Sequence, residues 1–217
     1  LFIVILCVAV QLVRMYVLSV QADTWVLVYG SFVPARFTLA GGFTDPLAWL
    51  TTVSYSFLHG SVLHVGVNMI WLLAFGSPVA ARIGPWRTAG FWVLTAVAAA
   101  LTHLAVFPDS MQPLVGASGS ISGMMAASAR YGFAPARDAR SSAFSGPLLS
   151  VRQTLTRRST LVFVGAWFIL NVISGLATLV PGEDAPIAWQ AHIGGFVVGF
   201  FAIAVFDRPR RPYNRRS

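Results

Sequence analysis

The feature that most constrains this chain is a series of long apolar runs separated by short polar stretches. A helix that spans a bilayer needs about 20 mainly apolar residues, whereas a surface helix of a soluble protein carries only an apolar stripe. Hydrophobic residues fill 56% of the 217 positions and charged residues only 10%, too few to cover a water-soluble globule. The sequence therefore predicts a polytopic membrane protein of the all-α class. Six segments can cross the bilayer: residues 1–20, 58–80, 88–107, 116–133, 161–180 and 188–206.

The segment between the first two predicted spans, residues 21–57, is neither charged nor uniformly apolar. It mixes aromatic residues with two prolines, and aromatic rings prefer the membrane–water interface, so we expect it to lie there. No internal repeat marks a second domain, and we expect one membrane domain over residues 1–217. The first run lacks a small-residue cleavage site, which favours a retained span over a signal peptide. Because the sequence begins at Leu1 inside an apolar run, we expect further residues to precede it.

The arginines orient this six-span prediction. The net charge is +8, all fifteen basic residues are arginines, and thirteen of them fall on one side of a six-span chain. Loops rich in basic residues stay in the cytoplasm, so both termini and the basic tail, residues 207–217, are expected there. No basic groove with interleaved aromatic residues is evident, which argues against a nucleic-acid partner. The thirteen arginines are Arg82, Arg87, Arg130, Arg137, Arg140, Arg152, Arg157, Arg158, Arg208, Arg210, Arg211, Arg215 and Arg216.

Polar residues interrupt three of the predicted spans near the same membrane face. A polar group in hydrocarbon is costly and is usually paired or functional. In the orientation above, the second, fourth and sixth spans all begin at the outer face. His64, Ser118 and His192 therefore lie near the outer ends of three different helices, at similar depth.

Ser118 lies in a run of small residues that extends from Gly116 to Gly123, and two interpretations fit this run. Gly119 and Gly123 form a G-x-x-x-G pair, which is typical of close helix packing in membranes. A serine at a helix start also has free backbone N–H groups and the positive end of the helix dipole beside it. That environment suits a nucleophile, because the tetrahedral intermediate carries an oxyanion. The two interpretations are compatible.

His192 opens a glycine-lined face of the sixth predicted span. Residues at i, i+3 and i+7 share a helix face, so His192, Gly195 and Gly199 align. Alone, such a histidine is more often a structural hydrogen-bonding group. Opposite a serine on a matching small-residue face, its imidazole is instead suited to take the serine proton as a general base. No carboxylate is placed to orient it, which favours a Ser118–His192 dyad over a triad.

His64 and Asn68 are four residues apart and project from one face of the second predicted span. Both can donate hydrogen bonds and neither is acidic, so they would suit an oxyanion hole beside a serine nucleophile. The alternative is a polar pair that satisfies itself between helices, and in isolation the two interpretations are evenly balanced.

The remaining polar residues of the apolar segments are interpreted as structural. His59 precedes the second span, and His103 has no evident partner in the sequence. Asn171 and Arg14 are interpreted as packing or snorkelling groups. Cys7 is the only cysteine, and no Cys/His spacing typical of zinc accompanies it.

Three motifs lie in order on the second, fourth and sixth predicted spans. They are HGSVLHVGVN at residues 59–68, GASG at 116–119, and AHIGG at 191–195, followed by Gly199. In this order they resemble the motifs of the rhomboid family of intramembrane serine proteases. The resemblance covers essentially the whole chain and implies a six-transmembrane-helix rhomboid-like bundle with an interfacial first loop.

The resemblance also implies a mechanism. Ser118 would be the nucleophile and His192 its general base. His64, Asn68 and the Ser118 backbone N–H would form the oxyanion hole, and neither a metal nor a cofactor would take part. His59 and five glycines would pack the helices around the site. These glycines are Gly116, Gly119, Gly123, Gly195 and Gly199.

The implied substrates are single-span membrane proteins, cut near the outer face after a small residue, with the fifth span beside their access route. The implied location is a bacterial cell membrane. Two positions depart from the family pattern. Many relatives carry an aromatic residue four positions after the nucleophile, packed on the histidine, where this chain has Ser122. Some carry Trp-Arg in the first loop, where this chain has Trp49 and Leu50.

Two other functions stay open at this point. One is a catalytically inactive rhomboid-like protein that binds membrane clients, although such relatives typically lack the serine or the histidine. The other is a small transporter, whose polar residues would line a pathway. Against a transporter, the sequence has no inverted repeat and no acidic residue in the middle of a predicted span.

Overall fold

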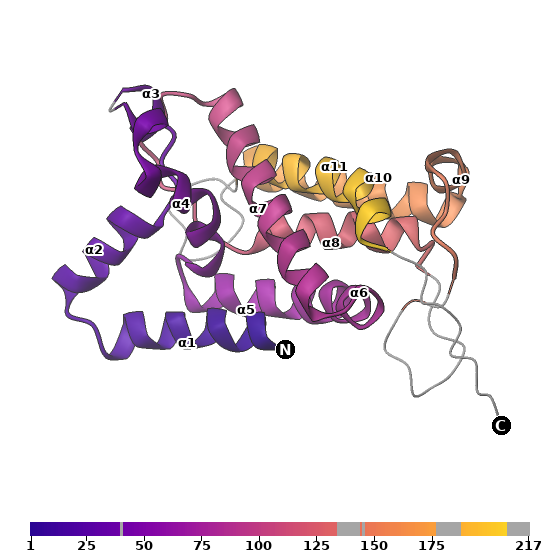
Figure 1. Cartoon of the computed structure of the whole chain (residues 1–217), viewed down its shortest axis with the longest axis horizontal. Helices are drawn as coiled ribbons and strands as arrows, with labels where there is room; N and C mark the ends of the chain where they lie inside the picture. Colours follow the sequence, from indigo (N-terminus) through magenta and orange to yellow (C-terminus); the bar gives the residue numbers. More distant parts are fainter. Residues whose placement is uncertain (40, 134–143, 145, 177–187, 208–217) are drawn as a thin grey trace.

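The computed structural model describes residues 1–39, 41–133, 144, 146–176 and 188–207. In this part of the chain the regular elements are all helices, and the only β-type pairing is one bridge between Phe32 and Leu114. Figure 1 shows a helical bundle flanked at one end by the short helices of the N-terminal quarter. The α-helices are α1 (Phe2–Tyr16), α2 (Val20–Gly30), α3 (Ala35–Thr38), α4 (Pro46–Ser54), α5 (Val62–Trp71), α6 (Ser77–Ile83), α7 (Pro85–Val106), α8 (Ser118–Arg130), α9 (Val151–Thr156), α10 (Arg158–Leu176) and α11 (Trp189–Phe206). Three short elements are the 3-10 turns η1 (Gly42–Thr44) and η2 (Tyr55–Phe57) and the π-turn η3 (Leu72–Gly76).

Four helices of the described chain are long and apolar enough to cross a membrane, which makes this an integral membrane protein. They are Val62–Ile83, which runs from α5 through η3 to α6, together with Pro85–Val106, Arg158–Gly175 and Trp189–Phe206. The first and fourth predicted segments also hold helices, but α1 has only 15 residues and α8 only 13. By length and composition the described chain therefore supports four spans, and the count of six stays a prediction.

The second apolar helix begins four residues later than its predicted start. Ser61 is the N-cap of α5, and its hydroxyl accepts the N–H of His64 at 3.1 Å. A capping serine satisfies one of the donors that a helix start leaves unpaired. His64 consequently lies in the first turn of α5, near the helix end. The described residues do not include the end of the fifth predicted span, from residue 177 on, or the acidic residues Glu183 and Asp184 that follow it. They also leave out most of the basic tail.

Residues 21–57, predicted to lie in the interface, fold mainly into short helices, of which α4 packs against α7. A group of aromatic rings holds them together, with the buried ring of Phe37 at its centre. The Phe37 ring lies 5.3 Å from those of Phe32 and Trp49, measured between centroids. Tyr55 reaches into the bundle and donates a hydrogen bond from its hydroxyl to the Ala96 carbonyl at 2.9 Å. This segment is thus a packed part of the fold.

The short helix α8 lies at the centre of the bundle, beside α7 and α11 (Figure 1). Every residue of α8 after Ser118 is buried. Its contact with α11 is backbone to backbone, because glycines face each other on both helices. A Cβ on Gly195 would meet the Gly119 carbonyl, and one on Gly199 would lie 2.6 Å from the Gly123 oxygen. The helices can approach this closely only without side chains at these positions.

Gly199→Ala should destabilise the fold by about 1–3 kcal/mol, because the added methyl meets the backbone of α8, which cannot move aside as a side chain could. The measurement is thermal unfolding in detergent. Gly165→Ala on α10 is the matched control, since a Cβ there has nothing within 4 Å. Equal midpoints for the two variants would contradict the backbone contact.

Candidate active site

Ser118 and His192 meet where two neighbouring helices begin. Ser118 is the first residue of α8, and His192 lies in the first turn of α11. The Ser118 Oγ and the His192 Nε2 are 2.7 Å apart, within hydrogen-bonding distance. The structure therefore brings together the two residues predicted to react, although 74 positions separate them in the sequence.

The turn before α8 keeps a space open beside Ser118. Gly116 has φ +123°, a conformation that other residues rarely adopt, and its N–H donates to the Tyr55 carbonyl at 3.0 Å. A Cβ on Gly116 would lie 2.9 Å from the His64 Nε2 and 3.6 Å from the Ser118 Oγ. The imidazole of His64 and the hydroxyl of Ser118 therefore border the same space, which a larger residue at 116 would fill.

Backbone donors and Asn68 complete the surroundings of this space. Because α8 begins at Ser118, the N–H groups of Ser118 and Gly119 have no acceptor within the helix. Asn68 is buried, and its Nδ2 donates to the carbonyl of His64 at 3.0 Å. One of its two amide hydrogens thus bonds within α5, and the second can donate to a group outside this helix.

Asn171, interpreted from the sequence as a packing group, contacts His192. Its Oδ1 lies 2.5 Å from the His192 Nδ1, and its Nδ2 donates to the Trp167 carbonyl at 2.8 Å. Both ring nitrogens of His192 therefore have partners, Ser118 on one side and Asn171 on the other. The signal in the sequence was an amide inside an apolar run, which is usually paired or functional.

Two further polar contacts surround the site. His103, which had no evident partner in the sequence, has its Nδ1 2.6 Å from the Nε2 of Gln190, and this contact ties the start of α11 to α7. Ser122, at the position where many relatives carry an aromatic residue, donates its hydroxyl to the Ser118 carbonyl at 2.8 Å. The Ser122 side chain thus bonds within α8.

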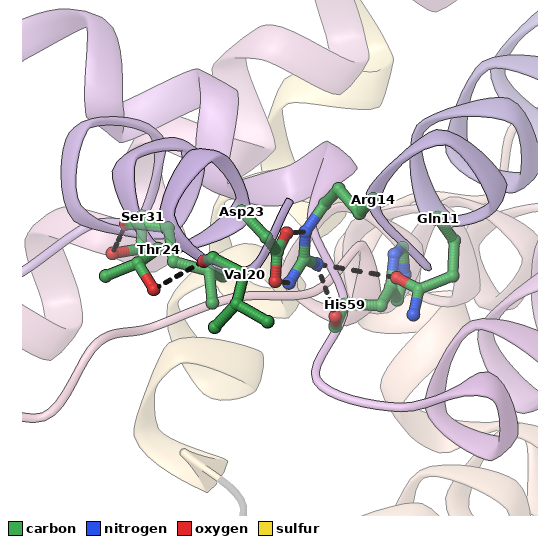
Figure 2. Close-up of polar contacts among 8 residues, drawn as sticks. Gln11, Arg14, Val20, Asp23, Thr24, Ser31 and His59 are labelled. Carbon is green, nitrogen blue, oxygen red and sulfur yellow. Dashed lines mark hydrogen bonds and ion pairs between the residues drawn. The ribbon is translucent and has the colours of Figure 1, made fainter. Parts of the chain in front are cut away.

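A buried arginine connects the first two helices to His59, two residues before the α5 cap (Figure 2). Arg14 donates from Nε to an Asp23 carboxylate oxygen at 2.7 Å and from Nη1 to the His59 carbonyl at 2.7 Å. The His59 ring in turn accepts the Ala117 N–H on Nε2 at 3.5 Å. Arg14 is buried and paired with Asp23, so it does not snorkel to the membrane surface. Through Arg14 and His59, a chain of contacts runs from α2 to Ala117, the residue before Ser118.

The described residues hold no group of three or more His, Cys, Asp or Glu side chains that could bind a metal ion. Cys7 is buried in the main hydrophobic cluster. The functional groups around Ser118 are a hydroxyl, imidazoles, an amide and backbone N–H groups, which suit proton transfer and stabilisation of an anion.

The sequence model of the Rhomboid domain matches residues 46–209, about three quarters of the chain, including Ser118 and His192. The chain belongs to the rhomboid family. It is 27% identical to the rhomboid protease GlpG of Serratia proteamaculans (strain 568) over 166 residues, which are 76% of this chain and 50% of that protein. It is 25% identical to RHOMBOID-like protein 5 of Arabidopsis thaliana over 170 residues, which are 74% of this chain and 45% of that protein. This rhomboid chain thus spans about half the length of these curated relatives.

Arg14→Met should lower the free energy of unfolding of this rhomboid by about 1.5–3 kcal/mol, since hydrogen bonds to a charged group are lost and Asp23 is left unpaired. Thermal unfolding in detergent measures the effect. The matched control is Arg87→Met, because Arg87 is exposed and donates only a long hydrogen bond, 3.5 Å, to the Phe206 carbonyl. A midpoint unchanged by Arg14→Met would show that the Arg14 contacts do not stabilise the fold.

Proposed function

We propose that this chain is an intramembrane serine endopeptidase in which Ser118 is the nucleophile and His192 the general base. The observation that carries the proposal is the 2.7 Å contact between the Ser118 Oγ and the His192 Nε2 at the start of α8. A hydroxyl becomes an effective nucleophile when a neighbouring base takes its proton, and imidazole does so near neutral pH. The similarity to a rhomboid protease supports the proposal.

In the proposed reaction the Ser118 Oγ attacks the carbonyl carbon of the scissile peptide bond while its proton moves to the His192 Nε2. The oxyanion that forms accepts hydrogen bonds from the Ser118 N–H, from His64 and from the second amide hydrogen of Asn68. His192 then gives its proton to the leaving amine, which departs and leaves an acyl-enzyme on Ser118. A water molecule, deprotonated by His192, hydrolyses this ester and restores the serine.

The proposed substrates are transmembrane segments of other membrane proteins, cut near the outer face after a small residue. Gly116 leaves a limited space between His64 and Ser118, which suits an oxyanion better than a bulky side chain. A water-filled cavity open to the outer face would supply the hydrolytic water, because intramembrane polar residues normally face such a cavity or one another.

The proposal includes the topology predicted from the sequence. The bundle would be one domain of six spans, with α1 and α8 as the two short ones and residues 21–57 at the outer interface. Both termini and thirteen of the fifteen arginines would be cytoplasmic, in a bacterial cell membrane. Ser118 and His192 would then open to the outer face.

The alternative is a catalytically inactive rhomboid-like protein that binds membrane clients. It would retain the fold and the client-binding surface but would not form a covalent bond at Ser118. A fluorophosphonate probe, which reacts with activated serines, distinguishes the two in purified and folded protein.

The first experiment compares wild type with Ser118→Ala and His192→Ala. Wild type should be labelled by the probe and should cleave a single-span reporter substrate. Each substitution should lower cleavage by at least about a thousandfold without unfolding the protein, because nucleophile and base act as a unit. Wild type that is folded but unlabelled at Ser118, or substantial cleavage by either variant, would refute the assignment.

The second experiment tests the oxyanion donors. Removing one such donor costs about 10²–10³ in kcat in serine proteases, so we expect an effect of about a hundredfold for His64→Ala. Asn68→Ala should cost less, about tenfold, because its amide is shared with the His64 carbonyl and the other oxyanion donors remain. The measurement is kcat with the reporter substrate in detergent, and a larger loss for Asn68→Ala than for His64→Ala would reverse the assigned roles.

A further inference from the structure

We propose that Asn171 is the positioning residue for His192, an inference that rests on the proposed function because it concerns how the base is held. Asn171 comes from α10, whereas the reacting residues come from α8 and α11. It is buried, with 8% of its surface exposed, on a helix whose neighbouring residues Leu170 and Ile173 are largely exposed. The amide is therefore turned inward, towards His192.

The orientation of the amide follows from its two hydrogen bonds. Trp167 offers a carbonyl oxygen, which only the Nδ2 of Asn171 can approach as a donor, at 2.8 Å. The Oδ1 must then face His192, where it lies 2.5 Å from Nδ1. An amide turned the other way would place two oxygens against each other and two nitrogens against each other.

This orientation fixes the state of the imidazole. Because the Asn171 Oδ1 can only accept, the Nδ1 of His192 carries the proton. In the neutral ring, Nε2 then holds the lone pair, and it faces the Ser118 hydroxyl at 2.7 Å. Asn171 thus selects the tautomer that can accept the serine proton, and it holds the ring plane towards Ser118.

Asn171 also fills a role that the other candidates in the described part of the chain do not fill. Ser122 bonds back to the Ser118 carbonyl, so it does not engage a nitrogen of the ring. The carboxylates of the described chain are engaged elsewhere, with Asp23 on Arg14 and Asp207 on Arg82. A neutral amide holds the ring without placing a charge in the membrane interior.

The position of α10 therefore determines whether the His192 ring is held in the orientation that the proposed reaction needs. Only 17% of the apolar stretch Arg158–Gly175 of α10 is buried in the bundle, against 44% for the apolar stretches of α7 and α11. It also packs against α11 through the rings of Trp167 and Phe196, which are stacked 4.4 Å apart. A displacement of α10 would therefore withdraw the acceptor from Nδ1 and leave the ring free to turn.

The test compares Asn171→Leu with Asn171→Asp. Both have nearly the shape of asparagine, but only aspartate retains an oxygen where Oδ1 lies. Asn171→Leu should lower kcat about 10- to 100-fold with KM changed less than about twofold, a part of the 10²–10⁴ that general-base catalysis supplies. The kcat of Asn171→Asp should be at least about fivefold higher than that of Asn171→Leu, since an acceptor for Nδ1 is restored. Thr160→Ala, a buried polar residue about 16 Å away along α10, is the control and should leave kcat unchanged.

An independent measurement does not require activity. In protein labelled with ¹⁵N-histidine, the His192 ring, assigned by comparison with His192→Ala, should carry its proton on Nδ1 in wild type and shift towards the other tautomer in Asn171→Leu. A wild-type ring protonated on Nε2, a normal kcat in Asn171→Leu, or equal losses in both isosteric variants would overturn the inference. Folded wild type that neither reacts with the probe nor cleaves would refute the proposed function, while the tautomer measurement would still test Asn171.

Discussion

The contact between α8 and α11 is the constraint on which the site depends. Serine and histidine have short side chains, so a 2.7 Å separation of Oγ and Nε2 requires their helices to lie almost in backbone contact. Gly195 and Gly199 provide this on one helix, and Gly119 and Gly123 on the other. Lipid gives no hydrophobic drive for helices to associate, so the dispersion energy of this close packing must hold them together. The glycines that look like a packing motif and those that place the reacting pair are the same residues.

Polar pairs add the directions that glycine packing alone does not give. His103 and Gln190 join α7 to the start of α11, while Asn171 joins α10 to His192, two residues further on. At the opposite end, Arg82 forms an ion pair with Asp207, 2.7 Å between Nη2 and Oδ2, which ties α6 to the end of α11. In each case a polar side chain, which would be costly in hydrocarbon when unpaired, is hydrogen-bonded to a partner on another element. These ties fix the rotation of α11, and with it the direction of the His192 ring.

The sequence predicted the helical membrane fold, the approximate position of each long helix and the residues that meet at the candidate site. Those predictions rest on apolar length and on i, i+3 and i+4 spacing, which are properties of single segments. The partners of Arg14 and Asn171 could not be obtained in this way, because they depend on how separate helices rotate against one another. The start of α5 was predicted too early because the cap at Ser61 decides it, and apolar content does not reveal a cap. Ser122 illustrates the same limit, since its side chain bonds within α8 and another helix supplies the partner of His192.

The shortness of α8 has a consequence for the proposed chemistry. Thirteen residues make a helix about 20 Å long, whereas the hydrocarbon core is about 30 Å thick. Arg130 ends α8, and its guanidinium donates to the carbonyls of Leu149 and Phe200 at 2.9 and 2.8 Å. If this end lies at the cytoplasmic boundary, as the topology proposes, Ser118 lies about 10 Å below the outer boundary. A peptide bond at that depth is hydrogen-bonded within the substrate helix, so it can be attacked only after local unwinding. The donors beside Gly116 and the start of α8 would then replace the hydrogen bonds that the unwound carbonyl has lost, which favours substrates whose helices are already weak near the cut.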